Sequence, residues 1–315
     1  MSSLMTNSAA MTALQTLSST NKQMDITQNR ISTGYRVSDA ADNAAYWSIA
    51  TTMRSDNKAL GAVQDALGLG AATVDVMYTA LNSTVEVVSE IKAKVTAAAQ
   101  PGVDRGKIQS EIDELQNQLR NIAASAVFNG ENWLQFDSTD AGASADREIV
   151  SSFTRTAGGA VSLETTTVEI GNTLLVDLDA GTAAGILDQD RSAAFTFAGG
   201  SVDGVSLLDL DINAGAADGD FSADMERAVG LVDAVLSDIT DAATNLGAIK
   251  NRIGLQQDFV ASLKDSIDRG VGQLVDADMN AESTRLQALQ VQQQLGIQAL
   301  SIANGNSQNI LSLFR

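Results

Sequence analysis

The two ends of the chain carry apolar residues at heptad-like spacing and almost no charge. The first charged side chain is Lys22, and residues 286–314 contain none. The repeats advance in steps of three, four or seven residues, which predicts long helices with one narrow apolar stripe each. Their positions are Leu4, Met11, Leu14, Leu17, Met24 and Ile31 at one end, and Leu286, Leu289, Gln293, Ile297, Leu300, Asn304 and Ser307 at the other. Because neither stripe can form a compact core alone, we expect the two ends to pack together.

The sequence leaves open which molecule completes these stripes. They can form an ordinary coiled coil within one chain, or neighbouring copies of the chain can cover them. A membrane span is excluded, because the many Gln and Asn side chains after Gln287 would lie unpaired in hydrocarbon. A cleaved signal peptide is not expected, because residues 1–21 lack a basic segment and a continuous apolar run.

The middle of the chain, residues 137–220, differs in composition from both flanks. It holds 15 acidic residues against three basic ones, which is 12 of the 19 net negative charges, and 11 of the 25 glycines. Runs rich in Val, Ile, Thr, Phe and Leu predict strands. These runs are 148–155, 161–170, 173–178 and 202–208, with turns expected at Gly158-Gly159, Gly199-Gly200 and Asp203-Gly204.

The flanks of this segment have helical periodicity over 44–100, 107–126 and 221–263. The fold class is therefore expected to be mainly α with a β-rich insert, with long antiparallel helices from the two termini. We expect three domains: an inner coiled coil, a helical bundle, and an acidic, surface-exposed insert. Their ranges are 1–45 with 275–315, 46–136 with 221–274, and 137–220.

Composition excludes several classes of function. The chain has no His and no Cys, which removes Ser-His-Asp and Cys nucleophiles, zinc sites of the Cys/His type and disulfides. A net charge of −19 repels nucleic-acid backbones. We expect no enzyme, no cofactor, no metal, no nucleic-acid partner and no membrane partner.

Two weaker patterns have simpler explanations. Three pairs of acidic residues could bind calcium or act on a sugar, namely Asp177/Asp179, Asp209/Asp211 and Asp218/Asp220. They lack the spacing of a calcium-binding loop, and we interpret them as solvated surface. Gly68 and Gly70 lie within a helical pattern, so close helix packing explains them better than a dinucleotide fingerprint.

Residues 29–45 carry the most information. Gly34 is expected to end a helix in the left-handed conformation. Ser38 or Asp39 is expected to cap the next helix, with Asp42 in its first turn and Arg30 and Arg36 flanking the link.

This segment resembles the signature of bacterial flagellins, Asn/Glu-Arg-Leu-Ser-Ser-Gly-hydrophobic-Arg-Ile-Asn-Ser followed by Ala, Asp and Asn. Further family motifs are matched in order by Phe128-Asn129-Gly130, Leu246–Arg252, Asp276–Glu282 and Asn304–Arg315. The resemblance covers about 1–136 and 221–315 and leaves 137–220 unmatched.

The resemblance implies a structural subunit that polymerises into the flagellar filament for swimming, and is exported unfolded by a flagellar type III apparatus to the cell exterior. Implied partners are other copies and related flagellins, the export apparatus and its chaperone, the filament cap and hook-junction proteins. We expect self-assembly to involve the apolar stripes and the link. The candidate residues are Leu4, Met11, Leu14, Leu17, Arg30, Arg36, Trp47, Leu289, Ile297, Leu300, Leu311 and Phe314.

The chain departs from the family pattern at two places. Tyr46-Trp47 replaces Gly-Leu, which suggests a specific packing contact for Trp47. Ser89, Glu90, Ile91 and Lys92 lie where many flagellins carry a motif read by the vertebrate innate flagellin receptor, and Glu90 stands in place of its central Arg. This charge reversal predicts weak receptor activation, as in flagellins of the alphaproteobacterial kind.

The sequence is compatible with three alternatives. A hook–filament junction protein would share the terminal pattern but occur in few copies. An acidic surface adhesin or carbohydrate-active protein would have its chemistry in 137–220. A soluble coiled-coil module would stay at one oligomer size.

Overall fold

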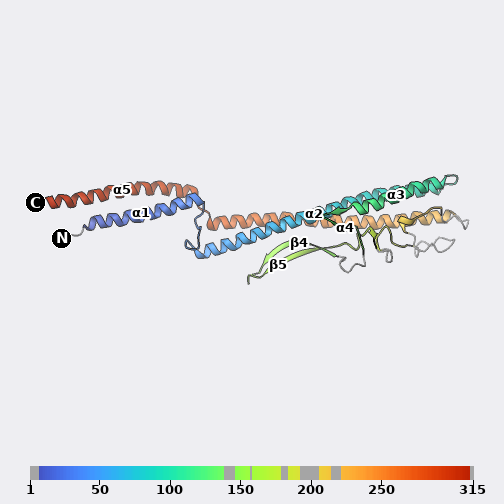
Figure 1. The fold of residues 1–315 in the computed structure, drawn as a ribbon, viewed down its shortest axis with the longest axis horizontal. Coiled ribbons are helices and arrows are strands. Elements are labelled where there is room, and N and C mark those ends of the chain that lie inside the picture. Colours follow the sequence, from blue (N-terminus) through green and yellow to red (C-terminus); the bar gives the residue numbers. More distant parts are fainter. Residues whose placement is uncertain are drawn as a thin grey trace. The chain divides into compact units, whose positions relative to one another are not determined.

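Long α-helices make up most of the residues that this computed structural model describes, which are 7–137, 146–156, 158–178, 184–191, 206–213 and 221–312 (Figure 1). The helices are α1 (Ser8–Thr33), α2 (Ala44–Ala98), α3 (Arg105–Ser125), α4 (Phe221–Val275) and α5 (Met279–Ser312). The strands are β1 (Val127–Phe128), β2 (Glu131–Asn132), β3 (Gln135–Phe136), β4 (Asp146–Arg155), β5 (Val161–Glu169) and β6 (Val176–Asp177). The predicted class, mainly α with a strand-containing middle region, is confirmed. Contacts within the chain define two units, 1–58 with 263–315 and 59–262.

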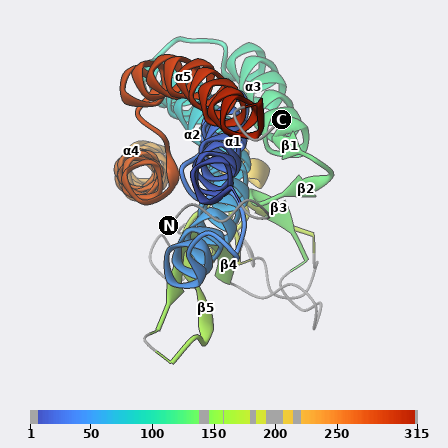
Figure 2. The same cartoon turned by 90° about the vertical axis from the view of Figure 1, so that its left-hand side faces the viewer.

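In the first unit, α1 and α5 lie side by side and run antiparallel (Figures 1 and 2). The Asn7 side chain caps the start of α1 by accepting a hydrogen bond from the Ala10 N–H. Gly34 ends α1 with a φ of +75°, and its N–H donates to the Arg30 carbonyl, as the sequence predicts. The two ends of the chain therefore pack together within one molecule.

The link between α1 and α2 differs from the prediction in its capping. Asn43 caps α2, because its side-chain oxygen accepts from the Tyr46 N–H. Asp42 precedes the helix and folds back, accepting hydrogen bonds from the Ser38 and Asp39 N–H groups. The Ser38 N–H is the main reason that the pKa of the Asp42 carboxyl is lowered, followed by that of Asp39. The expectation that Ser38 or Asp39 caps α2 was wrong, because Asn43 supplies an equally good cap nearer the first helical turn.

A small core holds this link against the end of α4. Val37 and Ala50 are buried with Val271 and Val275. The Val275 carbonyl accepts hydrogen bonds from the N–H groups of Arg36 and Val37. The link is therefore fixed by both apolar contact and backbone hydrogen bonds.

In the second unit, α2 and α4 pack antiparallel, with α3 on another side of α2 (Figure 2). Lys92 pairs with Asp233, and Lys250 pairs with Asp75. The core consists of aliphatic side chains from all three helices, including Leu67, Met77, Leu81, Ile91, Ile112, Leu119, Val232, Leu246 and Ile253. This burial follows the helical periodicity from which the helices were predicted.

The insert contributes an antiparallel hairpin, β4 with β5, whose turn includes Gly159 at a φ of +84°. Both strands and this turn were predicted. Ile149 packs against α2 at Gly70, where an added Cβ would lie 2.5 Å from a side-chain carbon of Ile149. Gly70 is thus explained by close packing, but the neighbour is a strand and not the helix that was expected, because the hairpin lies against α2 at this position. Arg252 and Gln256 of α4 donate hydrogen bonds to the carbonyls of Thr167 and Ser151 and so hold the hairpin along α4.

Of the predicted strand over 202–208, the structure describes only residues 206–208, and these residues do not form a strand. Leu207–Asp209 form a short 3₁₀ helix, η1. Side chains of α3 explain the difference: Gln116 donates to the carbonyls of Leu207 and Leu210, and Arg120 donates to that of Leu208. The carbonyls of this apolar run therefore pair with side chains of a helix, where a strand would have paired them with a neighbouring strand. The turns expected at 199–200 and 203–204 lie outside the described residues.

The predicted strand over 173–178 is reduced to β6, which pairs in parallel with β3. Beside it, the Asp188 carboxylate accepts a hydrogen bond from the Asp177 N–H at 2.6 Å. Burial raises the pKa of the Asp188 carboxyl, and the nearby Asp177 charge adds to the rise. Ionised Asp188 therefore costs the fold free energy at neutral pH.

This cost predicts the effect of Asp188→Asn. A raised folded-state pKa stabilises the fold at acidic pH, below the unfolded value of about 3.9, and this contribution is lost as the pH rises through the folded value. Asparagine can still accept the Asp177 N–H without carrying a charge. We expect the variant to have a higher Tm than the parent at pH 7, with the gap closing toward pH 4. Thermal melts followed by circular dichroism measure this, with Asp65→Asn on the exposed surface of α2 as the control. A lower Tm for Asp188→Asn at pH 7 would contradict the assignment.

Candidate self-assembly surface

The α1–α5 pair divides the predicted stripe residues into an inner and an outer set. Leu289 is buried, and Leu17 and Leu300 are half-buried. Leu17 packs at Gly296, where an added Cβ would lie 3.3 Å from a Leu17 methyl carbon. These three side chains lie on the covered side of the pair.

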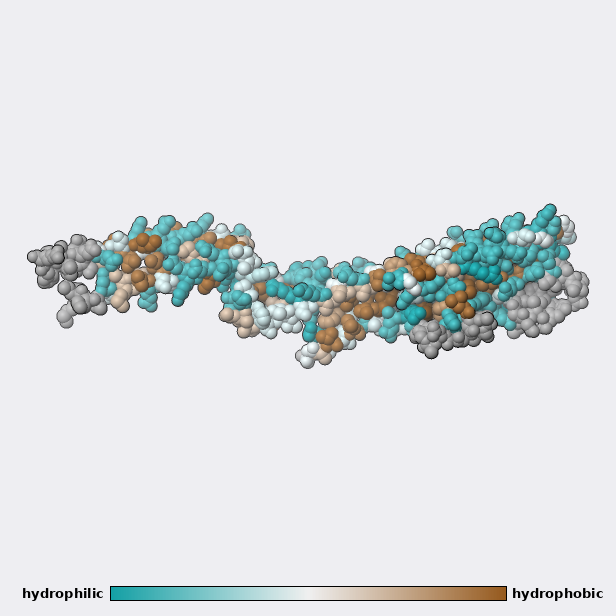
Figure 3. All heavy atoms as spheres, viewed as in Figure 1, coloured by the Kyte–Doolittle hydropathy of each residue, from teal (hydrophilic) through white to brown (hydrophobic). Residues whose placement is uncertain are grey.

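The outer set is exposed to solvent in the single chain. Met11 and Leu14 of α1 are 66% and 60% exposed, and Ile297 of α5 is 53% exposed. Further exposed apolar residues on α5 that the sequence argument missed are Val291, Leu295 and Ile302. Hydrophobic residues are visible among hydrophilic ones on the face of this pair that Figure 3 shows. The sequence contains a signal for their exposure: they are apolar residues that lie outside the heptad stripe, in a segment that carries no charge.

Polar contacts fix how α1 lies against α5. The Asn7 side chain donates to the Ala303 carbonyl, and Gln293 donates to the Asn21 side chain. Arg30 forms an ion pair with Glu282, with 2.9 Å between Nη1 and Oε1. The Glu282 side chain is only 10% exposed, so this pair has little competition from water. Sequence reasoning selected Arg30 but not Glu282, because the partners are 252 positions apart.

Arg36 and Trp47 lie in or beside the link. Arg36 donates to the carbonyls of Gln273 and Leu274 in the last turn of α4, where the helix dipole favours a cation. Trp47 is 38% exposed, and its neighbours Tyr46 and Ile49 are also exposed. Arg54 lies over the ring of Tyr35, 4.8 Å from its centre. The start of α2 thus presents aromatic and aliphatic side chains to solvent.

The predicted receptor region lies on α2 in the second unit. Ser89 and Glu90 are exposed, Ile91 is fully buried, and Lys92 is paired with Asp233. A protein that approaches this face of α2 therefore meets Ser89 and Glu90. Of the other predicted residues, Leu4, Phe314 and the side chain of Leu311 lie outside what the structure describes.

Comparison with known proteins identifies the family. The family model described as the bacterial flagellin N-terminal helical region matches residues 4–139, and that of the C-terminal helical region matches 229–314. The chain belongs to the bacterial flagellin family. It is 50% identical over 330 aligned positions to Flagellin C and 43% identical over 400 to Flagellin A, both of Rhizobium meliloti strain 1021, with all of both chains covered in each case. Among solved structures, Bacillus cereus flagellin is 19% identical with a TM-score of 0.39, covering 63% of this chain and 88% of that one.

Membership of the flagellin family gives the function. The chain is a structural subunit of the bacterial flagellar filament, the polymer of flagellin copies that serves swimming motility. The resemblance to alphaproteobacterial flagellins is confirmed by the Rhizobium meliloti relatives. Among the described residues, no helix combines the length and the apolar character needed to cross a membrane.

The ion pair between Arg30 and Glu282 predicts that Glu282→Ala destabilises the α1–α5 pair. The change leaves a half-buried guanidinium without its carboxylate, which costs about 1–3 kcal/mol. We expect filaments of the variant to dissociate at a lower temperature, measured by circular dichroism during heating. Lys107→Met is the matched control, because it removes an ion pair with Asp104 that is largely exposed and contributes less than about 1 kcal/mol. Equal melting of the two variants would argue against a role of Arg30–Glu282 in the pair.

Proposed function

We propose that the flagellin assembles through its terminal helices, whose outer apolar residues are covered by neighbouring copies. The observation that carries this proposal is the exposure of large apolar side chains on a pair of helices almost without charge. Covering apolar surface contributes about 25 cal/mol per Å², which opposes the entropy cost of ordering the ends. Many apolar side chains per copy, each contributing a small free energy when it is covered, can therefore drive assembly together.

The three predicted regions take different roles in this proposal. Residues 1–45 with 275–315 form the inner part of the filament, 46–136 with 221–274 a helical bundle, and 137–220 the face shown to water. The insert suits that place, since it carries most of the net negative charge of the chain. We assign no enzymatic activity to any of these regions.

The route to the filament is part of the same proposal. The subunit is exported unfolded by the flagellar type III apparatus with the help of a chaperone, without a cleaved signal peptide. Its further partners in this proposal are the filament cap and the hook-junction proteins. A chain without Cys suits this route, because no disulfide can trap it before export or form outside the cell.

Electron microscopy of purified protein under polymerising salt tests the assembly proposal. We expect long filaments from the full chain and none from a version that lacks residues 286–315. A sharper variant is Val291→Gln with Leu295→Gln, which makes the outer surface of α5 polar without touching Leu289. We expect it to reduce filament yield severely, whereas Gln290→Ala, a change at an exposed polar position, leaves assembly unchanged. Discrete particles from the full chain would favour a junction protein or a soluble module.

Trp47 gives a second test. We propose that the exposed indole packs against a neighbouring copy. Trp47→Ala then lowers the dissociation temperature of filaments, while the helix content of the monomer is preserved because the side chain is exposed. Ile49→Ala, at an exposed position two residues away, is the control. Loss of helix in the Trp47→Ala monomer would mean that the Trp47 side chain has its role in folding and not in assembly.

We also propose that the receptor region activates the vertebrate innate flagellin receptor weakly. Glu90 is exposed on α2 and presents a negative charge where many flagellins have Arg. We expect little response from purified monomer in a receptor reporter assay and a larger response from Glu90→Arg. A strong response from the unmodified chain would contradict the proposal.

A further inference from the structure

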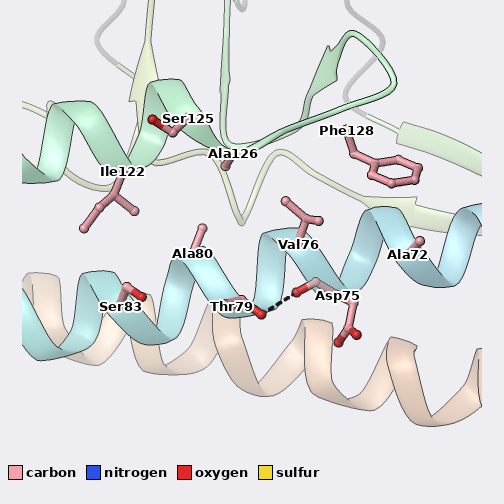
Figure 4. Close-up of a pocket in the computed structure, with 10 residues that line it drawn as sticks. All are labelled: Ala72, Asp75, Val76, Thr79, Ala80, Ser83, Ile122, Ser125, Ala126 and Phe128. Atoms are coloured by element: carbon pink, nitrogen blue, oxygen red, sulfur yellow. Dashed lines mark hydrogen bonds between the residues drawn. The ribbon is translucent and has the colours of Figure 1, made fainter.

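The second unit has a groove between α2 and the end of α3. Its volume is about 540 Å³, and its sides come from α2, the last turn of α3 and β1 (Figure 4). Apolar side chains face each other across it, with Val76 and Ala80 on one side and Ile122, Ala126 and Phe128 on the other. The small size of the alanines leaves the space open.

Among the described residues that line the groove, none offers a free charge to a ligand. The Asp75 carboxylate is paired with Lys250 of α4, which lies on the opposite side of α2 from the groove (Figure 4). The Thr79 hydroxyl donates to the Asp75 carbonyl within the same helix. An apolar side chain therefore suits this space better than a charged ligand.

The chain itself carries such side chains at another place on this unit. Leu255 and Phe259 of α4 are 72% and 55% exposed. Residues four apart lie on the same face of a helix, so the two form one apolar projection, which we name the α4 knob. The neighbouring Arg252 and Gln256 are hydrogen-bonded to the β4–β5 hairpin, which fixes this turn of α4 in place.

The knob and the groove cannot meet within one molecule. They lie on different sides of α2, because α4 packs on the side opposite the groove. Contact between two different surfaces of identical subunits is heterologous, and when its rotation does not close a ring it continues as an open fibre. This is the geometry that a filament subunit requires.

We propose that Leu255 and Phe259 of one copy dock in the groove between α2 and α3 of a neighbouring copy. The inference rests on the proposed self-assembly and adds a second contact to that of the terminal helices. Phe and Leu are inserted between Val76 and Ile122, which removes apolar surface of both copies from water. Central, fully covered aromatic residues carry most of the energy in such contacts.

Assembly of the variant Leu255→Ala with Phe259→Ala tests the knob. Both side chains are exposed in the monomer, so its circular dichroism should not change. We expect the critical concentration for polymerisation to rise roughly 30-fold, as for loss of one interface hot spot. Val103→Ala, which truncates another exposed apolar side chain of the second unit, is the matched control and should leave it unchanged. An unaltered critical concentration for the double variant would overturn the proposal.

Cross-linking tests the occupant of the groove, and a chain without Cys gives a clean background. Ser83→Cys, at the groove, is combined with Asp258→Cys, an exposed position beside the knob that leaves Leu255 and Phe259 in place, and filaments are treated with a short bis-maleimide. We expect a ladder of covalent oligomers from this pair. Ser83→Cys combined with Leu178→Cys, an exposed position on the insert, should give none. A cross-link within one chain, or no ladder from intact filaments, would overturn docking by a second copy.

The two proposals fail in different ways. Normal filaments without the Ser83–Asp258 cross-link would reject the docking contact and leave assembly through the terminal helices standing. Absence of filaments from the unmodified chain would count against self-assembly and reject the docking contact with it.

Discussion

The antiparallel packing of α1 on α5 is the interaction on which the first unit depends. It brings the two ends of the chain together and gives each narrow stripe a partner, as Leu17 at Gly296 and the buried Leu289 show. Three polar contacts along the pair, the last of them Arg30–Glu282, fix the register that apolar contact alone leaves adjustable. A two-helix pair cannot cover all of its apolar residues. The part left open is the basis of the assembly proposed for this flagellin.

In the second unit, the described parts of an acidic, glycine-rich insert are held against long helices. Polar side chains of the helices do much of this by donating hydrogen bonds to insert carbonyls, as Gln116 does to Leu207 and Gln256 to Ser151. Such bonds satisfy backbone groups that short strands leave unpaired. Ile149 adds an apolar contact at the one place where Gly70 makes room for it.

The chain has no His or Cys, and its recognition chemistry has to come from apolar burial, amides and ion pairs. These are interactions of a surface, spread over many residues, and they suit a polymer. The exposed apolar side chains at α1–α5 and at the α4 knob lie in different units. Two separate contacts per subunit would make a filament stiffer than one contact could.

The sequence by itself determined the helices, the hairpin, the family and the charge-poor ends, because periodicity, glycine positions and the motif around Gly34 are local signals. It also indicated that the ends pack together. Tertiary structure alone decided which stripe residues are covered and which stay exposed, since that depends on how α1 lies on α5. It also decided that Glu282 partners Arg30, that Asn43 caps α2 in place of Ser38 or Asp39, and that the run near Leu207 forms a 3₁₀ helix. Each of these outcomes depends on a neighbour close in space, or on competition between adjacent caps, that linear spacing does not encode.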